Sequence, residues 1–110
     1  MMNIFILCLV GPNAPQNLGL VKSDKSSLTI RWSAPIPLLG KRFPIYKYFI
    51  EREQSRAHRS GISYPVTGTS DQYTYTLSNL TANTIYKIYV SAYNHAGKGP
   101  PISGSFETGG

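Results

Sequence analysis

Apolar and polar residues alternate in short runs along most of this chain, and turn-forming residues separate the runs. In the clearest run, Leu28, Ile30 and Trp32 share one face, and Thr29 and Arg31 share the other. This period of two is typical of a half-buried strand, and no run has helical periodicity. The pattern predicts strands at residues 16–21, 27–32, 45–52, 62–66, 72–77, 86–94 and 102–108.

Seven short strands separated by turns favour an all-β fold. We expect a seven-stranded antiparallel β-sandwich with Greek-key connections and immunoglobulin-like architecture. The 110 residues are enough for one domain, which at this size buries roughly two thirds of the surface of its unfolded chain. The positions that face inward predict a single core of Leu28, Ile30, Trp32, Tyr48, Ile50, Tyr75, Leu77, Leu80, Ile88, Val90 and Ala92.

Proline, glycine and polar residues mark the connections between these strands. Residues 11–15 form a boundary, residues 53–61 a polar and basic connection, and residues 97–101 a final turn. Pro65 makes its strand an edge strand, because proline cannot donate to a ladder. The loop at residues 33–44 is unusually apolar and either caps the core or forms a contact patch through Ile36, Leu38, Leu39 and Phe43.

The stretch from Leu80 to Pro101 carries the most specific pattern. Tyr86 opens a strand just after a turn, where a tyrosine can cover the edge of a sandwich core and hydrogen-bond the backbone a few residues upstream. Taken with this corner, the chain resembles the fibronectin type III family over about Pro12 to Thr108. The matching features are Ala14-Pro15-Gln16-Asn17-Leu18, Trp32, Tyr48 with Ile50, Leu80 with Tyr86, and Asn94-His95-Ala96-Gly97-Lys98-Gly99-Pro100.

The chain departs from some members of that family. It has no Arg-Gly-Asp tripeptide, which argues against integrin recognition by that route. Ala82 stands where the family often has a proline. Paired cysteines and a Trp-Ser-x-Trp-Ser element are also missing, which argues against a cytokine-receptor module.

The resemblance implies a non-enzymatic protein-interaction and spacer module. It points to the extracellular part of a receptor or cell-adhesion protein, with neighbouring domains in tandem, a protein partner and an extracellular or cell-surface location. Two alternatives stay open: a cytoplasmic structural module of the muscle type, and an accessory domain of a secreted enzyme. No cofactor is expected.

The net charge of +6 makes polyanions possible partners. The densest basic region contains Arg52, Arg56, His58 and Arg59, with Lys41, Arg42 and Lys47 nearby. It predicts contact with a sulfated polysaccharide or an acidic protein, and a solvated loop is the alternative. A nucleic acid is not expected, because no nucleic-acid-binding fold is suggested.

Asn79-Leu80-Thr81 is a sequon for N-glycosylation, or else a chance match. Leu80 is expected to point inward and Asn79 outward, because strand neighbours alternate. The aromatic residues Phe49, Tyr89 and Tyr93 are expected on an outer sheet face, as an interface or as cross-strand pairs.

Catalytic and metal chemistry find no support in the sequence. The two histidines, His58 and His95, lie in predicted loops, and the five acidic residues are scattered. The single cysteine, Cys8, cannot form an internal disulfide, and this set of residues matches no zinc-ligand spacing.

The chain starts with an unbroken apolar run from Ile4 to Val10. It is too short for a transmembrane helix, which needs about 20 residues, so no transmembrane segment is expected. We divide the chain into an apolar leader at residues 1–11, the domain at 12–108 and the start of a linker at 109–110. The leader is a short signal peptide, a remnant or an extra edge strand.

Overall fold

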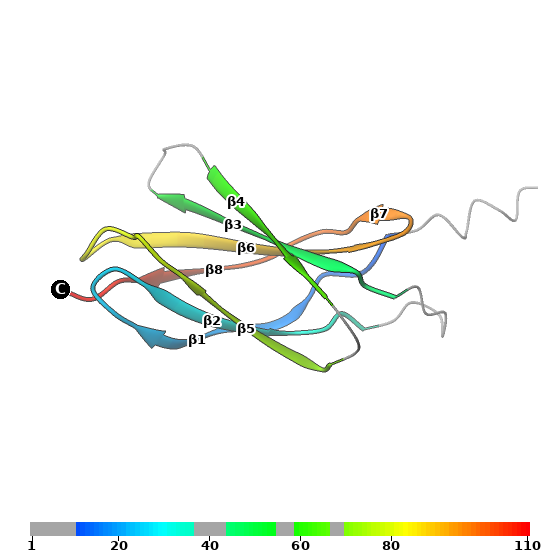
Figure 1. Cartoon of the computed structure of the whole chain (residues 1–110), viewed down its shortest axis with the longest axis horizontal. Coiled ribbons are helices and arrows are strands. Elements are labelled where there is room, and N and C mark those ends of the chain that lie inside the picture. Colours follow the sequence, from blue (N-terminus) through cyan, green and yellow to red (C-terminus); the bar gives the residue numbers. More distant parts are fainter. Residues whose placement is uncertain (1–10, 37–43, 55–58, 67–69) are drawn as a thin grey trace, which may run out of the picture.

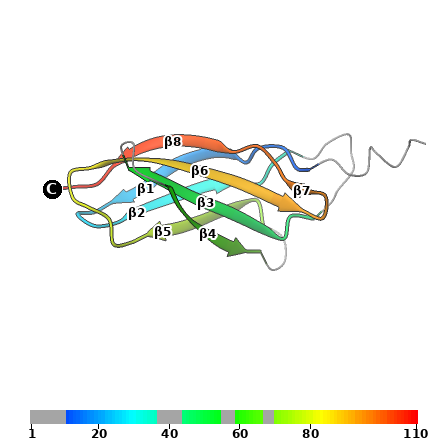
Figure 2. The ribbon, with the colours of Figure 1, turned by 90° about the horizontal axis from the view of Figure 1, so that it is seen from above.

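Two antiparallel sheets pack face to face in the computed structural model, which describes residues 11–36, 44–54, 59–66 and 70–110. Figures 1 and 2 show the two layers from perpendicular directions. The predicted all-β sandwich is therefore confirmed. The strands are β1 Gln16–Ser23, β2 Leu28–Ser33, β3 Lys47–Gln54, β4 Arg59–Pro65, β5 Gln72–Leu77, β6 Ile85–Asn94, β7 Gly97–Lys98 and β8 Ile102–Glu107.

The smaller sheet has the order β1-β2-β5, and the larger one has the order β4-β3-β6 with β7 and β8 both paired to β6. The hairpins β1–β2 and β3–β4 stay within one sheet. The chain changes sheets between β2 and β3, between β4 and β5, and again between β5 and β6. These crossings bring the inner faces of both sheets onto one core, as in a Greek-key sandwich.

Most strand boundaries differ from the prediction by one or two residues, and some differences are larger. β1 runs on to Ser23 through an irregular register with β2. β3 and β4 extend into the predicted connection at 53–61, because the pairs Glu53↔Arg59 and Arg52↔Ser60 continue the ladder. Polar residues fit there, since the end of an edge hairpin faces water on both sides. The predicted final turn contains the two-residue strand β7.

The core lies between the sheets and is centred on Trp32, which is fully buried. Trp32 contacts Tyr48 and Tyr64 edge to face, with ring centroids 5.3 and 5.5 Å apart, and stacks on Tyr73 at 5.9 Å. Tyr75 is only partly buried against this cluster. The fully or nearly buried hydrophobic residues are Leu28, Ile30, Trp32, Tyr48, Ile50, Leu77, Leu80, Tyr86, Ile88, Val90 and Ala92.

The two ends of the described domain lie at opposite poles of the sandwich (Figure 1). At one pole, Gly11 lies against the backbone of Lys98 in β7. At the other, Gly110 lies beside Asn83 in the β5–β6 connection. The division at residues 11 and 12 and at 108 and 109 remains a prediction, and residues 1–10 lie outside the described part of the chain.

Candidate interaction surfaces

Tyr86 locks the connection between β5 and β6. Its hydroxyl accepts a hydrogen bond from the Thr81 backbone N–H at 2.8 Å, five residues upstream. The Leu80 N–H donates to the Ser26 carbonyl at 2.9 Å, which ties the same turn to the β1–β2 connection. Leu80 is therefore buried while Asn79, with a φ of 60°, is exposed.

Thr108 fastens the other side of this turn, a role that the sequence analysis did not assign to it. Its hydroxyl donates to the Thr81 carbonyl at 2.6 Å and accepts from the Thr84 N–H at 3.0 Å. Thr108 is 3% exposed. Because both bonds are made by one small side chain at the end of β8, the corner and the last strand are held as one unit.

The predicted basic region does not form one cluster in the described part of the chain. Arg52 points to the inner side of β3, where its Nη1 donates to the Ser78 carbonyl at 3.1 Å. Arg59 lies on the outer side, with its guanidinium 3.9 Å from the centre of the Tyr89 ring. Arg56 and His58 lie outside the described residues.

The outer face of the larger sheet instead gathers cations over aromatic rings. Lys47 lies 4.4 Å from the centre of the Tyr93 ring, and Lys98 lies 5.4 Å from that of Phe49. Lys87 lies 5.4 Å from the Tyr89 ring that Arg59 also covers. Cation–π contacts at exposed sites contribute about 0.5–1 kcal/mol each. We call this surface the aromatic–basic face; it consists of Lys47, Phe49, Arg59, Lys87, Tyr89, Tyr93 and Lys98.

Two carboxylates sit within the aromatic–basic face and are already engaged. Glu51 lies 3.6 Å from Arg59 and 4.0 Å from Lys98, and its side chain is only 16% exposed. Glu53 accepts a hydrogen bond of 2.7 Å from the Tyr89 hydroxyl. Within the described residues, Lys47 and Lys87 form no ion pair within 4.0 Å. An incoming acidic group can therefore meet these two lysines without competing with a carboxylate of the described residues.

Tight packing fixes the aromatic rings of this face. The Phe49 ring covers Gly61 so closely that a Cβ at residue 61 would clash with it. Ser91 faces the same way but is 1% exposed, and its hydroxyl has no hydrogen-bond partner among the described groups. Phe49, Tyr89 and Tyr93 are each half-buried. The three rings are thus partly buried in the sheet surface, and the Phe49 ring lies directly over the backbone of Gly61.

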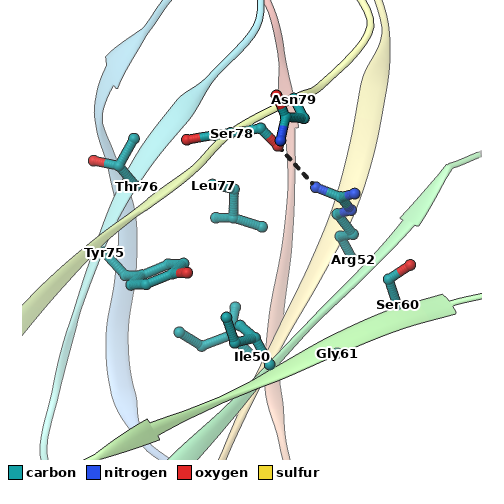
Figure 3. A pocket seen from close by; sticks show the side chains of 10 residues that line it. Ile50, Arg52, Ser60, Gly61, Tyr75, Thr76, Leu77, Ser78 and Asn79 are labelled. Carbon is teal, nitrogen blue, oxygen red and sulfur yellow. Dashed lines mark hydrogen bonds between the residues drawn. The ribbon is translucent and has the colours of Figure 1, made fainter.

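A second surface feature opens along the side of the sandwich, between the edge strands β4 and β5. This side groove has a volume of about 310 Å³. Figure 3 shows Ile50 and Leu77 at its floor, Tyr75 on the β5 side, and Arg52 with its bond to Ser78 next to Asn79 at one end. The described residues of its lining are partly apolar and include one charged side chain, Arg52.

The remaining predicted features do not form a site. Ile36 is 61% exposed, while Leu38, Leu39 and Phe43 lie outside the described residues. His95 stacks on Tyr46, with ring centroids 5.9 Å apart. Over residues 11–36, 44–54, 59–66 and 70–110, no three His, Cys, Asp or Glu side chains are grouped as metal ligands would be.

The environment of Tyr48 clearly changes the acidity of its hydroxyl group. Burial raises the pKa of Tyr48 well above the ordinary tyrosine value, and the neighbouring Tyr73 adds to the rise. The Tyr48 hydroxyl has no hydrogen-bond partner within the described structure. The hydroxyl lies inside the core, so its raised pKa bears on the stability of the fold.

Alternation along the strands places Phe49, Tyr89 and Tyr93 outward, but it does not show which cations cover them. Which cation covers which ring depends on the register of two hairpins, which sets the pairs Glu53↔Arg59 and Tyr93↔Lys98. The sequence alone does not give the register of either hairpin. The side groove also depends on two strands from different sheets. No local pattern in the sequence marks either feature.

The described residues include no helix that is long and apolar enough to cross a bilayer.

Comparison with known proteins agrees with the fold. The chain is 32% identical over 97 residues to the receptor-type tyrosine-protein phosphatase mosPTP-1 of Culex quinquefasciatus, covering 88% of this chain and 6% of that protein. It is 32% identical over 91 residues to receptor-type tyrosine-protein phosphatase S of Gallus gallus, covering 82% of this chain and 5% of that protein. The chain thus spans about a twentieth of the length of these relatives.

Solved structures show the same sandwich. The FN5 domain of Drosophila Lar superposes with a TM-score of 0.69 at 19% identity, covering 90% of this chain and 98% of that one. The FN1–FN3 domains of chicken CNTN1 give 0.72 at 23% identity, covering 91% of this chain and 33% of that one. The sequence pattern of the fibronectin type III domain matches residues 13–108, and the chain therefore belongs to the fibronectin type III domain family.

Proposed function

We propose that this domain is a non-enzymatic protein-interaction and spacer module from the extracellular part of a receptor or cell-adhesion protein. A fibronectin type III domain is a non-catalytic unit, and the relatives named above are receptor-type phosphatases of which it matches only a small part. Their phosphatase activity is a property of those proteins. What this chain shares with them is the module.

The spacer role is supported by the positions of the two ends. Residues 11 and 110 lie at opposite poles (Figure 1), next to Lys98 and Asn83 respectively. Neighbouring domains attached at these ends would extend in a line and leave both outer sheet faces open. An interaction surface on a sheet face then stays accessible within a tandem array.

The aromatic–basic face carries the proposal of an interaction role. Tyrosine, phenylalanine and arginine are enriched at the centres of protein interfaces, where rigid rings provide contact area at low entropic cost. Here Phe49, Tyr89 and Tyr93 are held in place, and Lys47 and Lys87 lie beside them without a carboxylate partner within the described structure. This arrangement fits a protein surface with an apolar centre and acidic residues around it.

A sulfated polysaccharide fits this face less well. Glu51 and Glu53 lie among the rings and would repel a continuous polyanion passing over them. Arg59 and Lys98 are partly neutralised by Glu51. A protein partner can place its acidic groups selectively over Lys47 and Lys87, whereas a uniformly sulfated chain cannot.

The proposal is tested with a fluorescent tetramer of the domain, applied to intact cells of several adherent types. We expect Lys87→Glu to abolish binding and higher salt to weaken it. Arg31→Glu is the matched control, because it makes the same change of charge on an exposed residue of the other sheet. Absence of binding, equal loss in both variants, or loss after heparinase treatment would each contradict a protein partner on this face.

A further inference from the structure

Asn79 stands at one end of the side groove, and its surroundings suit a carbohydrate. It is the acceptor position of the sequon Asn79-Leu80-Thr81, it is exposed, and its φ of 60° belongs to a turn held by Tyr86. We propose that Asn79 carries an N-linked glycan whose first sugar packs into the side groove between β4 and β5. This inference rests on the extracellular location in the proposed function.

The groove offers both kinds of contact that a sugar ring uses. Figure 3 shows the Tyr75 ring and the side chains of Leu77 and Ile50 along its floor, below Asn79. The partly exposed Tyr75 and Ile62, which is 44% exposed, provide an apolar surface for the C–H face of a sugar, and Ile50 and Leu77 are nearly buried beneath them. At about 310 Å³ the groove is at the small end of ligand pockets, which begin at roughly 300 Å³. That size suits one ring and not an extended oligosaccharide.

The polar rim of the groove matches a neutral, hydroxyl-rich group. Among the described lining residues Arg52 alone is charged, and one of its five N–H groups donates to the Ser78 carbonyl. The others remain available to the hydroxyl and acetamide oxygens of an N-acetylated sugar. Ser60 and Thr76 add hydroxyl groups at the edges of the groove.

A sugar in this place would also protect the two strand edges that flank the groove. β4 and β5 are the outermost strands of their sheets on this side, and Ile62 in β4 is 44% exposed. Unpaired edges with exposed apolar residues invite pairing with other chains. On the other side of the sandwich, β1 and β8 lie close together, so the groove side has more need of a cover.

The attachment reaction requires a lipid diphosphate-linked oligosaccharide as the co-substrate. The Asn79 side-chain Nδ2 forms a bond to C1 of the first sugar, the bond from C1 to the diphosphate oxygen breaks, and the amide loses one proton as the lipid diphosphate leaves. In the folded domain Leu80 is buried and the Thr81 N–H is bonded to Tyr86. The transfer therefore occurs before the corner folds.

The test uses the full chain, secreted from a glycosylating host and trimmed with an endoglycosidase to a single sugar. Intact mass, compared with Asn79→Gln, reports whether Asn79 is modified. Nuclear Overhauser contacts from the sugar protons to the Tyr75 ring and the exposed Ile62 side chain report docking. We also expect backbone amide exchange in β4 and β5 to slow by about threefold relative to Asn79→Gln, since docking opposes local opening.

A matched control moves the glycan out of the groove. Thr74→Asn combined with Asn79→Gln creates the sequon at residues 74–76 on the outer side of β5, because Thr74 faces away from the core. We expect the sugar there to show no contact with Ile62 and no protection of β4. A modified Asn79 without these contacts, or with protection equal to the control, would overturn docking.

Secreted chain without a glycan would overturn the modification itself. Neither result affects the cell-binding comparison of Lys87→Glu with Arg31→Glu, which does not involve the sugar. A failure of the proposed function is seen in that comparison alone, so the two inferences can fail separately.

Discussion

Replacement of a buried tyrosine by phenylalanine at two positions tests whether the Tyr86 hydroxyl stabilises the connection between β5 and β6. Tyr86 and Tyr48 are 3% and 0% exposed, and replacing each by phenylalanine removes one hydroxyl and leaves the ring. The Tyr86 hydroxyl accepts from the Thr81 N–H at 2.8 Å. The Tyr48 hydroxyl has no partner in the described structure. The two variants therefore differ in whether a hydrogen bond is lost.

The expected magnitudes follow from this difference. Tyr86→Phe leaves the partly buried Thr81 N–H without its acceptor, which costs about 1–3 kcal/mol. Tyr48→Phe removes a buried polar group that gains nothing from the protein, so the free energy of unfolding should stay the same or rise by up to about 1 kcal/mol. The two variants should therefore lie on opposite sides of the wild-type chain or, at the least, be clearly separated.

Equilibrium unfolding in urea measures both effects, and the fluorescence of Trp32, the only tryptophan, provides the signal. With slopes of about 1–3 kcal/mol per molar urea for small proteins, the Tyr86→Phe midpoint should fall by about 1 M. The slope should not change, because the core still unfolds as one unit. Equal midpoints for both variants, or a larger loss for Tyr48→Phe, would refute the assignment of the corner hydrogen bond.

Three further predictions concern the core and the entry of the chain. Above pH 10 Tyr48 ionises in the unfolded chain but stays neutral in the folded state, because burial raises its pKa. The free energy of unfolding should therefore be unaffected by this group below pH 10 and fall by up to about 1.4 kcal/mol per pH unit above it. Urea unfolding at a series of pH values should show a steeper fall for the wild-type chain than for Tyr48→Phe. Trp32→Ala should cost about 3–5 kcal/mol in urea unfolding, and a cost below about 1 kcal/mol would contradict its central position. Gly99→Ala should lower stability by about 1–3 kcal/mol, measured thermally, because its Cβ would meet the backbone carbonyl of Pro12; an unchanged melting temperature would contradict this close approach.

Alternation of apolar and polar residues within each strand is sufficient to predict most of the fold, because each strand buries one face. The inward positions of Leu28, Ile30 and Trp32, and of Ile88 and Val90, follow from a period of two, and all are buried. The corner was also readable, since it depends on a tyrosine a few residues after a turn. These features need no knowledge of which strands pair.

The surfaces were less readable, because they depend on pairing between strands that are distant or joined by loops of unknown geometry. Arg52 and Arg59 are close in sequence, and their proximity suggested one cluster. Instead, Arg52 shares the inner side with Ser60, while Arg59 shares the outer side with Glu53. The register of the β3–β4 hairpin decides which residues of β4 share a side of the sheet with which residues of β3, and composition does not reveal that register.

That register is held in place from outside the core as well as from within. A slip of β4 by one residue would turn Arg59 toward the inner side, remove the cation from Tyr89 and break the ion pair with Glu51. It would also replace Gly61 under the Phe49 ring by a residue with a Cβ, for which the ring leaves no room. A glycine at position 61 therefore favours the observed register of the β3–β4 hairpin. The same steric fit that holds β4 in place also fixes Phe49, so the stability of the hairpin and the preformed shape of the aromatic–basic face have one cause.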